Sequence, residues 1–88
     1  MFRLWGKCVS KNRVVRETVA EDGDYSKSRT RMVLDCLSAV CREFDLAEPI
    51  WLDSNISEFR RRSCTRFRQD SFVEELEFDW LEIRVLEE

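Results

Sequence analysis

The sequence predicts an α+β fold in which one amphipathic helix packs across a mainly antiparallel β-sheet. Two segments of alternating apolar and polar residues, near 2–9 and 78–86, have the period-two pattern of half-buried strands. Between them, a β-branched run near 14–20 indicates another strand, and apolar residues near 29–47 recur at helical spacing. A short helix is expected near 55–62. The predicted order is therefore strand, strand, helix, short helix, strand.

The first two strands are expected to form a hairpin. From Phe2 to Val9, one side of the strand is apolar or small, and the other side carries charges and Trp5. A polar break follows, in which Asn12 tolerates the backbone angles of a turn. The run that begins at Val14 then resumes an extended pattern. The apolar side of the first strand consists of Phe2, Leu4, Gly6 and Cys8.

The long helix has the clearest pattern in the chain. Ser26, Ser28 and Thr30 are successive candidates for its N-cap, because each hydroxyl can accept a hydrogen bond from a free backbone N–H. At 100° per residue, the apolar side chains occupy one sector about 160° wide, which suits packing on a sheet. Pro49 disfavours helical angles in the residue before it and is expected to end the helix. The apolar sector comprises Val33, Leu34, Cys36, Leu37, Val40, Cys41, Phe44 and Ala47.

The short helix is expected to begin with a polar cap and to end among arginines. Asn55 followed by Glu58 has the spacing of a capping box, and Asp53 and Ser54 are the other candidate caps. Its expected end is near Arg62, since the crowded arginines propagate a helix poorly. The last strand then places Leu81, Ile83 and Val85 on one side and Trp80, Glu82, Arg84 and Leu86 on the other.

The composition excludes several classes of protein. Hydrophobic residues make up 43% and charged residues 38% of the chain, which suits a single folded domain over residues 1–88 and argues against disorder. A net charge of −3 excludes the strongly basic profile of a dedicated nucleic-acid binder. The chain has no histidine, so it lacks the commonest general base and metal ligand. Because it also lacks a nucleophile motif and a glycine-rich cofactor loop, it is expected to be no enzyme and to bind no cofactor.

The four cysteines are expected to be free thiols, because no Cys-x-x-Cys pair is present. On a helix, Cys36 and Cys41 would lie about 140° apart, which is a poor geometry for a shared metal, so no metal site is expected. No stretch approaches the roughly 18 apolar residues of a membrane-spanning helix. The first residues carry charges where an export signal needs an apolar core. These features predict a cytoplasmic protein without a membrane partner.

Charge is unevenly distributed over the last third of the chain. Five arginines and one acid lie between Glu58 and Arg68, whereas eight acids and one arginine follow, from Gln69 to Glu88. The guanidinium group is a rigid fork of donors that suits phosphate, so the cluster is a candidate site for an anion, a phosphate or a nucleic acid. Consecutive helical arginines point about 100° apart, so no more than two of the first three can contact one ligand. The cluster consists of Arg60, Arg61, Arg62, Arg66 and Arg68.

The alternative for this cluster is a structural one. The arginines could pair with the acids between Glu74 and Glu82 of the same chain, or simply form a solvated face. Cys64 lies within the cluster, where positive charge favours a thiolate. However, a phosphatase-type loop requires the spacing Cys-x5-Arg, and Asp70 stands at the position of that arginine. A buried or idle thiol therefore accounts better for Cys64.

Trp5 and Trp80 are candidates for a partner interface. Both lie on the strand sides opposite to the predicted helix-packing side, so they are expected to be exposed together. An exposed aromatic patch on a sheet is a common protein interface, and a chain this small gains stability by dimerising there. The alternative is a register error of one residue, which would return both side chains to the core.

Several short motifs are spread over most of the chain. They are Leu4-Trp5-Gly6-Lys7, Phe44-Asp45-Leu46, Pro49-Ile50-Trp51-Leu52-Asp53-Ser54-Asn55-Ile56, Thr65-Arg66-Phe67 and Gln69-Asp70. In these motifs the sequence resembles a group of short bacterial proteins of unknown function. The resemblance implies a free-standing intracellular bacterial protein, and it carries no activity, ligand or catalytic residue to any position of this chain.

These observations favour a small soluble intracellular protein that acts as a non-enzymatic protein-interaction module. Its expected partner is another protein or a second copy in a homodimer, bound through the sheet face or strand edge that exposes Trp5 and Trp80. The alternative is binding of an anion, a phosphate or, as a less favoured ligand, a nucleic acid through the arginine cluster 60–68. Salt separates the two, because phosphate contacts release counterions whereas an aromatic interface is nearly independent of salt.

Overall fold

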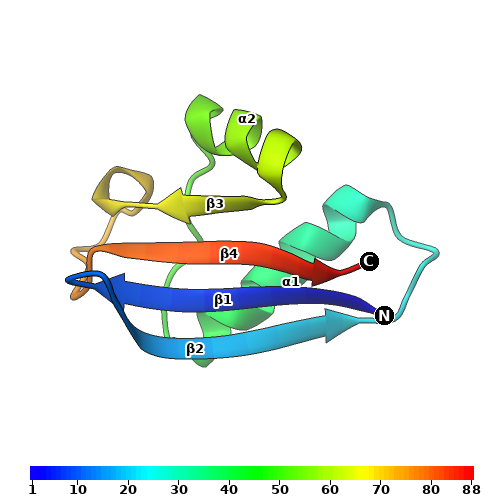
Figure 1. Ribbon diagram of the computed structural model, residues 1–88, viewed down its shortest axis with the longest axis horizontal. Helices are drawn as coiled ribbons and strands as arrows, with labels where there is room; N and C mark the ends of the chain where they lie inside the picture. Colours follow the sequence, from blue (N-terminus) through cyan, green and yellow to red (C-terminus); the bar gives the residue numbers. More distant parts are fainter.

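Four antiparallel strands form one sheet in the computed structural model, which describes residues 1–88 (Figure 1). The strands are β1 (Phe2–Ser10), β2 (Arg13–Asp22), β3 (Cys64–Phe67) and β4 (Trp80–Glu87), and they lie in the order β2-β1-β4-β3. All three neighbouring pairs are antiparallel. The predicted α+β class with a mainly antiparallel sheet is therefore confirmed.

Two helices accompany the sheet, α1 (Arg29–Glu43) and α2 (Asp53–Arg62). Helix α1 lies across one face of the sheet, and α2 lies beyond the edge formed by β3 (Figure 1). A single 3-10 turn at Gln69–Ser71 follows β3. Neither α-helix combines the length and the apolar character that a membrane span requires. The opposite face of the sheet is left without a helix.

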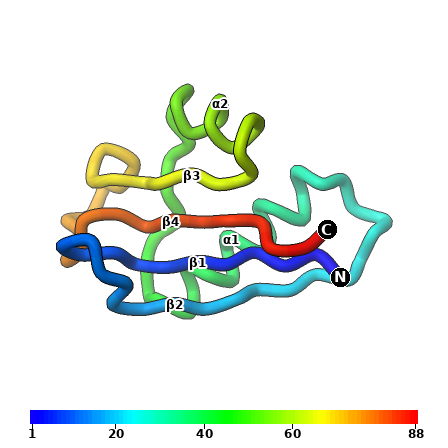
Figure 2. Tube along the Cα trace, in the orientation of Figure 1, coloured from blue at the N-terminus to red at the C-terminus, as the bar shows by residue number.

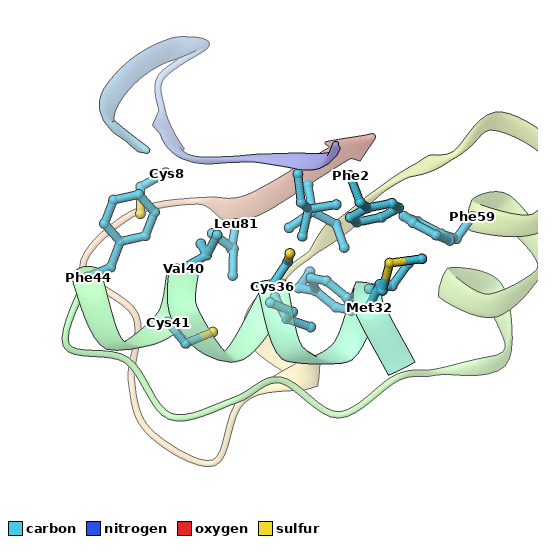
Figure 3. Packing of buried hydrophobic residues seen from close by; sticks show 14 of the residues in the cluster. Phe2, Cys8, Met32, Cys36, Val40, Cys41, Phe44, Phe59 and Leu81 are labelled. Atoms are coloured by element: carbon cyan, nitrogen blue, oxygen red, sulfur yellow. The ribbon is translucent and has the colours of Figure 1, made fainter. Parts of the chain in front are cut away.

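The hydrophobic core lies between α1 and the sheet (Figure 3). The apolar sides of β1 and β4 face α1, as their alternating patterns predict, and the buried sector of α1 packs onto them. Aromatic residues from α2, β3 and the chain after the 3-10 turn close one side of the core. The cluster comprises Phe2, Leu4, Cys8, Met32, Val33, Cys36, Leu37, Val40, Cys41, Phe44, Phe59, Phe67, Phe72, Leu81 and Ile83.

Gly6 allows α1 to approach β1 closely. A side-chain carbon at this position would collide with both methyl groups of Val40, which is fully buried on α1. Gly6 lies in the middle of the sheet, where it is paired with Thr18 of β2 and Ile83 of β4. The missing side chain therefore determines how near the helix lies to the sheet.

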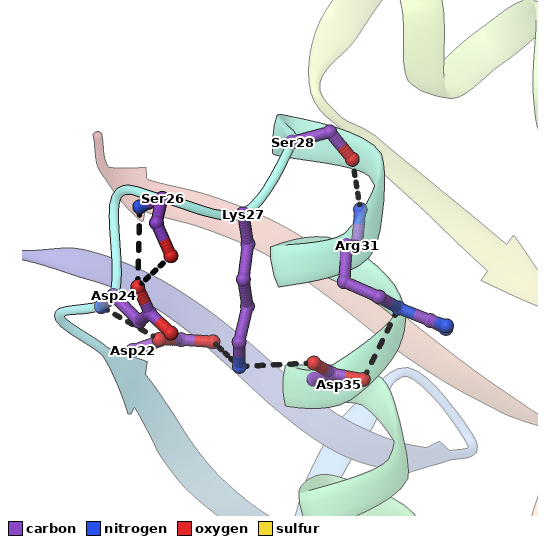
Figure 4. A network of polar contacts seen from close by, with 7 residues as sticks. All are labelled: Asp22, Asp24, Ser26, Lys27, Ser28, Arg31 and Asp35. Atoms are coloured by element: carbon purple, nitrogen blue, oxygen red, sulfur yellow. Dashed lines mark hydrogen bonds and ion pairs between the residues drawn. The ribbon is translucent and has the colours of Figure 1, made fainter.

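The start of α1 is held by a polar network at the end of β2 (Figure 4). Of the three candidate caps, Ser28 is the N-cap, and its hydroxyl accepts a hydrogen bond from the Arg31 N–H at 3.0 Å. The Lys27 ammonium donates to a carboxylate oxygen of Asp22 at 2.9 Å and of Asp35 at 3.0 Å. These hydrogen bonds raise the pKa of Lys27 and lower that of Asp22. The network thus ties β2 to the first turns of α1.

Helix α1 ends at Glu43, a few residues before the predicted end near residue 47. Asp45 adopts left-handed backbone angles with φ 55°, and the Leu46 N–H donates to the Cys41 carbonyl at 2.8 Å. This is the Schellman pattern of helix termination, and aspartate tolerates the left-handed position better than most residues. The end of the helix is therefore set by Asp45, and Pro49 lies in the loop beyond it.

The chain then crosses from the β2 side of the sheet to the β3 side before α2 begins (Figure 2). Along this segment the Ile50 N–H donates to the Ser71 carbonyl at 2.7 Å. Trp51 packs edge-on against Phe59 of α2 and Phe67 of β3, with ring centroids 5.5 and 5.0 Å apart. Trp51 thus joins α2 to the sheet.

Strand β3 is a fourth strand that the sequence pattern did not indicate. Ser63 ends α2 with left-handed angles at φ 55°, and the chain turns directly into β3. Thr65 and Phe67 of β3 are buried toward the core, opposite Ile83 and Leu81 of β4. With only four residues, this strand is too short for its period to be recognised, and pairing with β4 defines it.

Candidate anion-binding groove

The sheet face opposite α1 carries charged and aromatic side chains in a defined register. Trp5 of β1 pairs with Arg84 of β4, and Lys7 pairs with Glu82. On the next strand, Arg66 of β3 pairs with the same Glu82. Since paired residues of antiparallel strands point to the same face, these side chains form two neighbouring rows on this face of the sheet, Trp5–Arg84 and Lys7–Glu82–Arg66.

A groove of about 530 Å³ lies between α2 and this face of β3 and β4. Seven charged side chains line it, five of them arginines from α2, from β3 and its end, and from β4. Guanidinium groups from separate elements can surround an anion in a way that neighbouring residues of one helix cannot. The seven charged residues are Glu58, Arg61, Arg62, Arg66, Arg68, Glu82 and Arg84.

Glu82 is the buried carboxylate at the base of the groove. Arg66 Nε lies 3.1 Å from its carboxylate, Lys7 Nζ lies 3.4 Å away, and the Trp80 indole N–H donates to it at 3.3 Å. Burial alone would raise the pKa of Glu82, but the charge of Lys7 and the hydrogen bonds from Arg66 and Trp80 outweigh it and lower that pKa. Glu82 is therefore ionised at neutral pH, and it orients Arg66 rather than acting as a proton acceptor.

Three of the five arginines have no carboxylate partner. Arg61, Arg62 and Arg68 form no ion pair within the protein and are exposed. Arg61 and Arg62 lie in the last turn of α2, where positive charge is favoured by the partial negative charge of the helix end. The groove thus contains positive charge that the protein itself does not neutralise.

The groove brings together four of the five arginines of the predicted cluster. Arg60 is the exception, because it points away from the groove and lies beside Ile56 on another side of α2. This follows from the 100° rotation per residue, which allows only two of three consecutive arginines to share a site. Arg84 is the arginine of the groove that the sequence pattern did not indicate. Its only signal was its place with Glu82 on the polar side of the last strand.

Trp5 and Trp80 both lie half-buried on the sheet face opposite α1, on the side that the alternating pattern assigned to them. Trp80 lies under the guanidinium groups of Arg66 and Arg68, 4.6 and 5.6 Å from its ring centroid. The Trp5 ring is covered by the Lys7 ammonium at 4.2 Å. Trp80 does not line the groove itself but supports two of its arginines, Arg66 and Arg68.

The two tryptophans do not form one apolar patch. The ion pair between Lys7 and Glu82 lies in the rows of the sheet that separate Trp5 from Trp80. The Trp5 indole N–H is also satisfied within the chain, since it donates to Glu17 at 3.1 Å. A partner that binds both tryptophans would therefore also contact the Lys7–Glu82 ion pair between them. The partner interface at Trp5 and Trp80 stays a prediction.

All four cysteines are free thiols, but only Cys64 reaches the surface, where it lines the groove. Burial raises the pKa of Cys8 to about 11 and that of Cys41 to about 12, and it also raises the pKa of Cys36. Thiol reactivity depends on access and on the thiolate fraction, and both are low for these three core thiols.

We therefore expect Cys64 to react with iodoacetamide at least about tenfold faster than the three core thiols in the native protein. Mass spectrometry of peptides after brief alkylation measures the rate at each site. In denaturant all four cysteines should react at similar rates, which provides the control. Equal native rates at Cys64 and Cys41 would contradict this expectation.

Comparison with protein-family models, with curated proteins and with solved structures finds no significant match to this chain. The chemistry of the groove therefore has to be derived from its own residues. No group of three or more Cys, Asp or Glu side chains lies close enough together to hold a metal ion. The chemically distinctive feature of the groove is its excess of arginines.

Proposed function

We propose that this chain is a small binding protein that holds a phosphate-bearing anion in the arginine groove and has no catalytic activity of its own. The observation that carries this proposal is the convergence of five arginines from three parts of the fold, three of them without a carboxylate partner. Uncompensated positive charges repel each other in the free protein, so an anion that contacts several of them gains more than a single ion pair would.

A compact phosphate group suits the groove better than a long nucleic-acid backbone. Three guanidinium groups around one hollow match the several oxygens of a phosphate or a short polyphosphate. An extended polyanion would also meet the acidic residues from Glu74 to Glu88, in a chain whose net charge is −3. We therefore expect a small phosphate-bearing molecule as ligand, and single-stranded RNA or DNA to bind no tighter than about micromolar at physiological salt.

The absence of catalysis is part of the proposal. The groove contains two carboxylates and one thiol that could take part in chemistry, Glu58, Glu82 and Cys64. Glu82 is held as an ionised carboxylate by Lys7, Arg66 and Trp80, so it is a poor general base. The chain has no histidine, so the Cys64 thiol lacks the base that most often activates a thiol. Binding and release of an intact anion is the function that these groups support.

Inorganic tripolyphosphate is a suitable probe of the groove. We expect it to bind the wild-type protein in calorimetric titrations, with a slope of log K against log salt of about −2 to −3 for three phosphate contacts. The double variant Arg61→Glu/Arg62→Glu should weaken binding about 100-fold or more, because two donors are replaced by repulsive charges. Bound tripolyphosphate should also slow alkylation of Cys64, since this thiol lines the same groove.

The matched control is Arg42→Glu/Arg60→Glu, which changes the net charge by the same amount at exposed positions outside the groove. This variant should retain binding within a factor of about three, because only long-range charge is altered. An equal loss of affinity in both double variants, or no binding by the wild-type protein, would overturn the proposal. Turnover of phosphate monoesters by the wild-type protein would contradict its non-catalytic part.

A protein-interaction surface at Trp5 and Trp80 is the second candidate function. The observation that favours it is that both side chains lie half-buried on the sheet face opposite α1. Aromatic side chains beside a polar rim are typical of transient interfaces between proteins. Such an interface would be nearly insensitive to salt, in contrast to binding at the arginine groove.

A further inference from the structure

The two edges of the sheet are protected to different degrees. At one edge, β3 has only four residues and α2 lies beside it (Figure 1). At the other edge, β2 has ten residues; α1 contacts it from one face of the sheet, but no further strand pairs with its outer side, and its outward backbone groups form no backbone hydrogen bond. The outward backbone N–H and C=O groups of β2 are therefore free to pair with another strand.

Strand β2 has charged side chains and one bulge, but it lacks the strongest of the features that prevent pairing between edges. It contains no lysine and no proline, which are the residues that most often block an edge. Val14, Val15 and Val19 are 44, 55 and 46% exposed, although β-branched residues favour a paired strand. The single irregularity is a bulge that leaves Val15 without a partner on β1. The edge thus resembles one that is covered in an assembly.

The charges along β2 are arranged so that two antiparallel copies of the strand would be complementary to each other. Arg13 and Arg16 lie toward its beginning, and Glu21 and Asp22, which also pair with Arg3 and Lys27 of the same chain, lie at its end. In an antiparallel pair of two identical strands, each basic end lies beside the acidic end of the other strand. A parallel pair would instead place like charges together. This pattern selects a second copy of the same strand as the partner.

We propose that the chain forms a homodimer in which β2 pairs antiparallel with β2 of a second copy, so that the two sheets join into one of eight strands. A twofold axis at Thr18 places Glu17 opposite Val19. If Val15 stays bulged, the same register brings Arg13 opposite Asp22, so the whole strand pairs from end to end. The added backbone hydrogen bonds supply affinity, and the end charges define the register.

This interface lies beyond the proposed function and leaves the groove free. The groove is at the β3 edge, and β1 and β4 separate it from β2. Two copies joined through β2 would carry their arginine grooves at the two far ends of the common sheet. The interface also differs from the pairing through Trp5 and Trp80, because neither residue lies on β2.

Sedimentation equilibrium on the full chain tests the proposal. We expect a reversible dimer of twice 10.6 kDa to form as concentration rises from about 1 µM to about 1 mM. Val19→Glu should weaken the dimer at least about tenfold. Each dimer contains two places where residue 19 of one copy lies opposite Glu17 of the other, and the substitution puts two negative charges together at both places. Val19→Lys should retain or tighten the dimer, because the new charge is opposite to that of Glu17.

The control is Val73→Glu, which changes a residue that is 94% exposed in a loop outside β2, and it should leave the dimer unchanged. Circular dichroism confirms that each variant is folded. Hydrogen exchange should show protection that increases with protein concentration and is confined to β2 amides. A mass of 10.6 kDa at every concentration would overturn the proposal. So would an equal effect of the two Val19 variants.

Discussion

Alanine in place of Gly6 is expected to lower the free energy of unfolding by about 3 kcal/mol, at the upper end of the usual cost of overpacking a core. The added methyl group would collide with Val40, and Val40 is fully buried on the face of α1 that contacts the sheet. The helix would have to move away from β1, which loosens contacts along its whole length. Urea unfolding followed by circular dichroism measures the effect.

Two further variants test this explanation. Gly23→Ala adds the same methyl group at the other glycine, where it would make only an ordinary contact with Met1, so stability should change by less than about 0.5 kcal/mol. The double variant Gly6→Ala/Val40→Ala should lose less unfolding free energy than the two single variants lose together, because the smaller residue 40 leaves room for the new methyl group. Additive single effects would show that the collision with Val40 is not the cause.

Removing the Asn55 side chain is expected to cost about 3 kcal/mol of unfolding free energy, because three hydrogen bonds of a buried group are lost. Asn55 Oδ1 accepts from the Leu52 N–H at 3.0 Å, and its Nδ2 donates to Thr65 Oγ1 at 3.0 Å and to the Arg66 carbonyl at 2.9 Å. In Asn55→Ala the partners in β3 would remain buried and lose these bonds. Thermal and urea unfolding measure the loss.

The same substitution should weaken anion binding, because Asn55 fixes α2 against β3 on either side of the groove. Tripolyphosphate affinity is expected to fall about tenfold, since Arg61 and Arg62 would no longer be held opposite Arg66 and Arg84. Ser57→Ala is the matched control for stability only, because Ser57 is exposed on the same helix but also lines the groove. If both variants unfold at the same denaturant concentration, Asn55 does not join helix and strand.

Part of the groove was visible in the sequence. The concentration of arginines between residues 58 and 68 indicated the region. The rotation of about 100° per helical residue also predicted that at most two of the first three arginines contact one ligand. Arg84 was not recognised, because it belongs to a strand some twenty residues away in a segment dominated by acids. Glu82 and Trp80 reach the same place through the pairing of β3 with β4, which no local pattern reveals.

The capping residues show a similar limit. Asn55 and Glu58 have the spacing of a capping box, which suggested that Asn55 is the first cap of α2. In the structure Asn55 lies inside the helix, accepts a hydrogen bond from Leu52 and uses its amide group to hold β3. A polar residue near a helix start has several available partners, and the strand that packs beside it decides which one it takes.

Periodicity in the sequence identified the side chains that face the core, because burial against one surface imposes a period of two on strands and of 3.6 on helices. That rule identified the apolar sides of β1, β4 and α1, and it placed Trp5 and Trp80 on the opposite face. The existence of β3 and the gathering of five arginines around one groove became visible only in the tertiary structure. These features depend on contacts between segments distant in the chain, such as that of Arg66 with Glu82, and a local period carries no information about them.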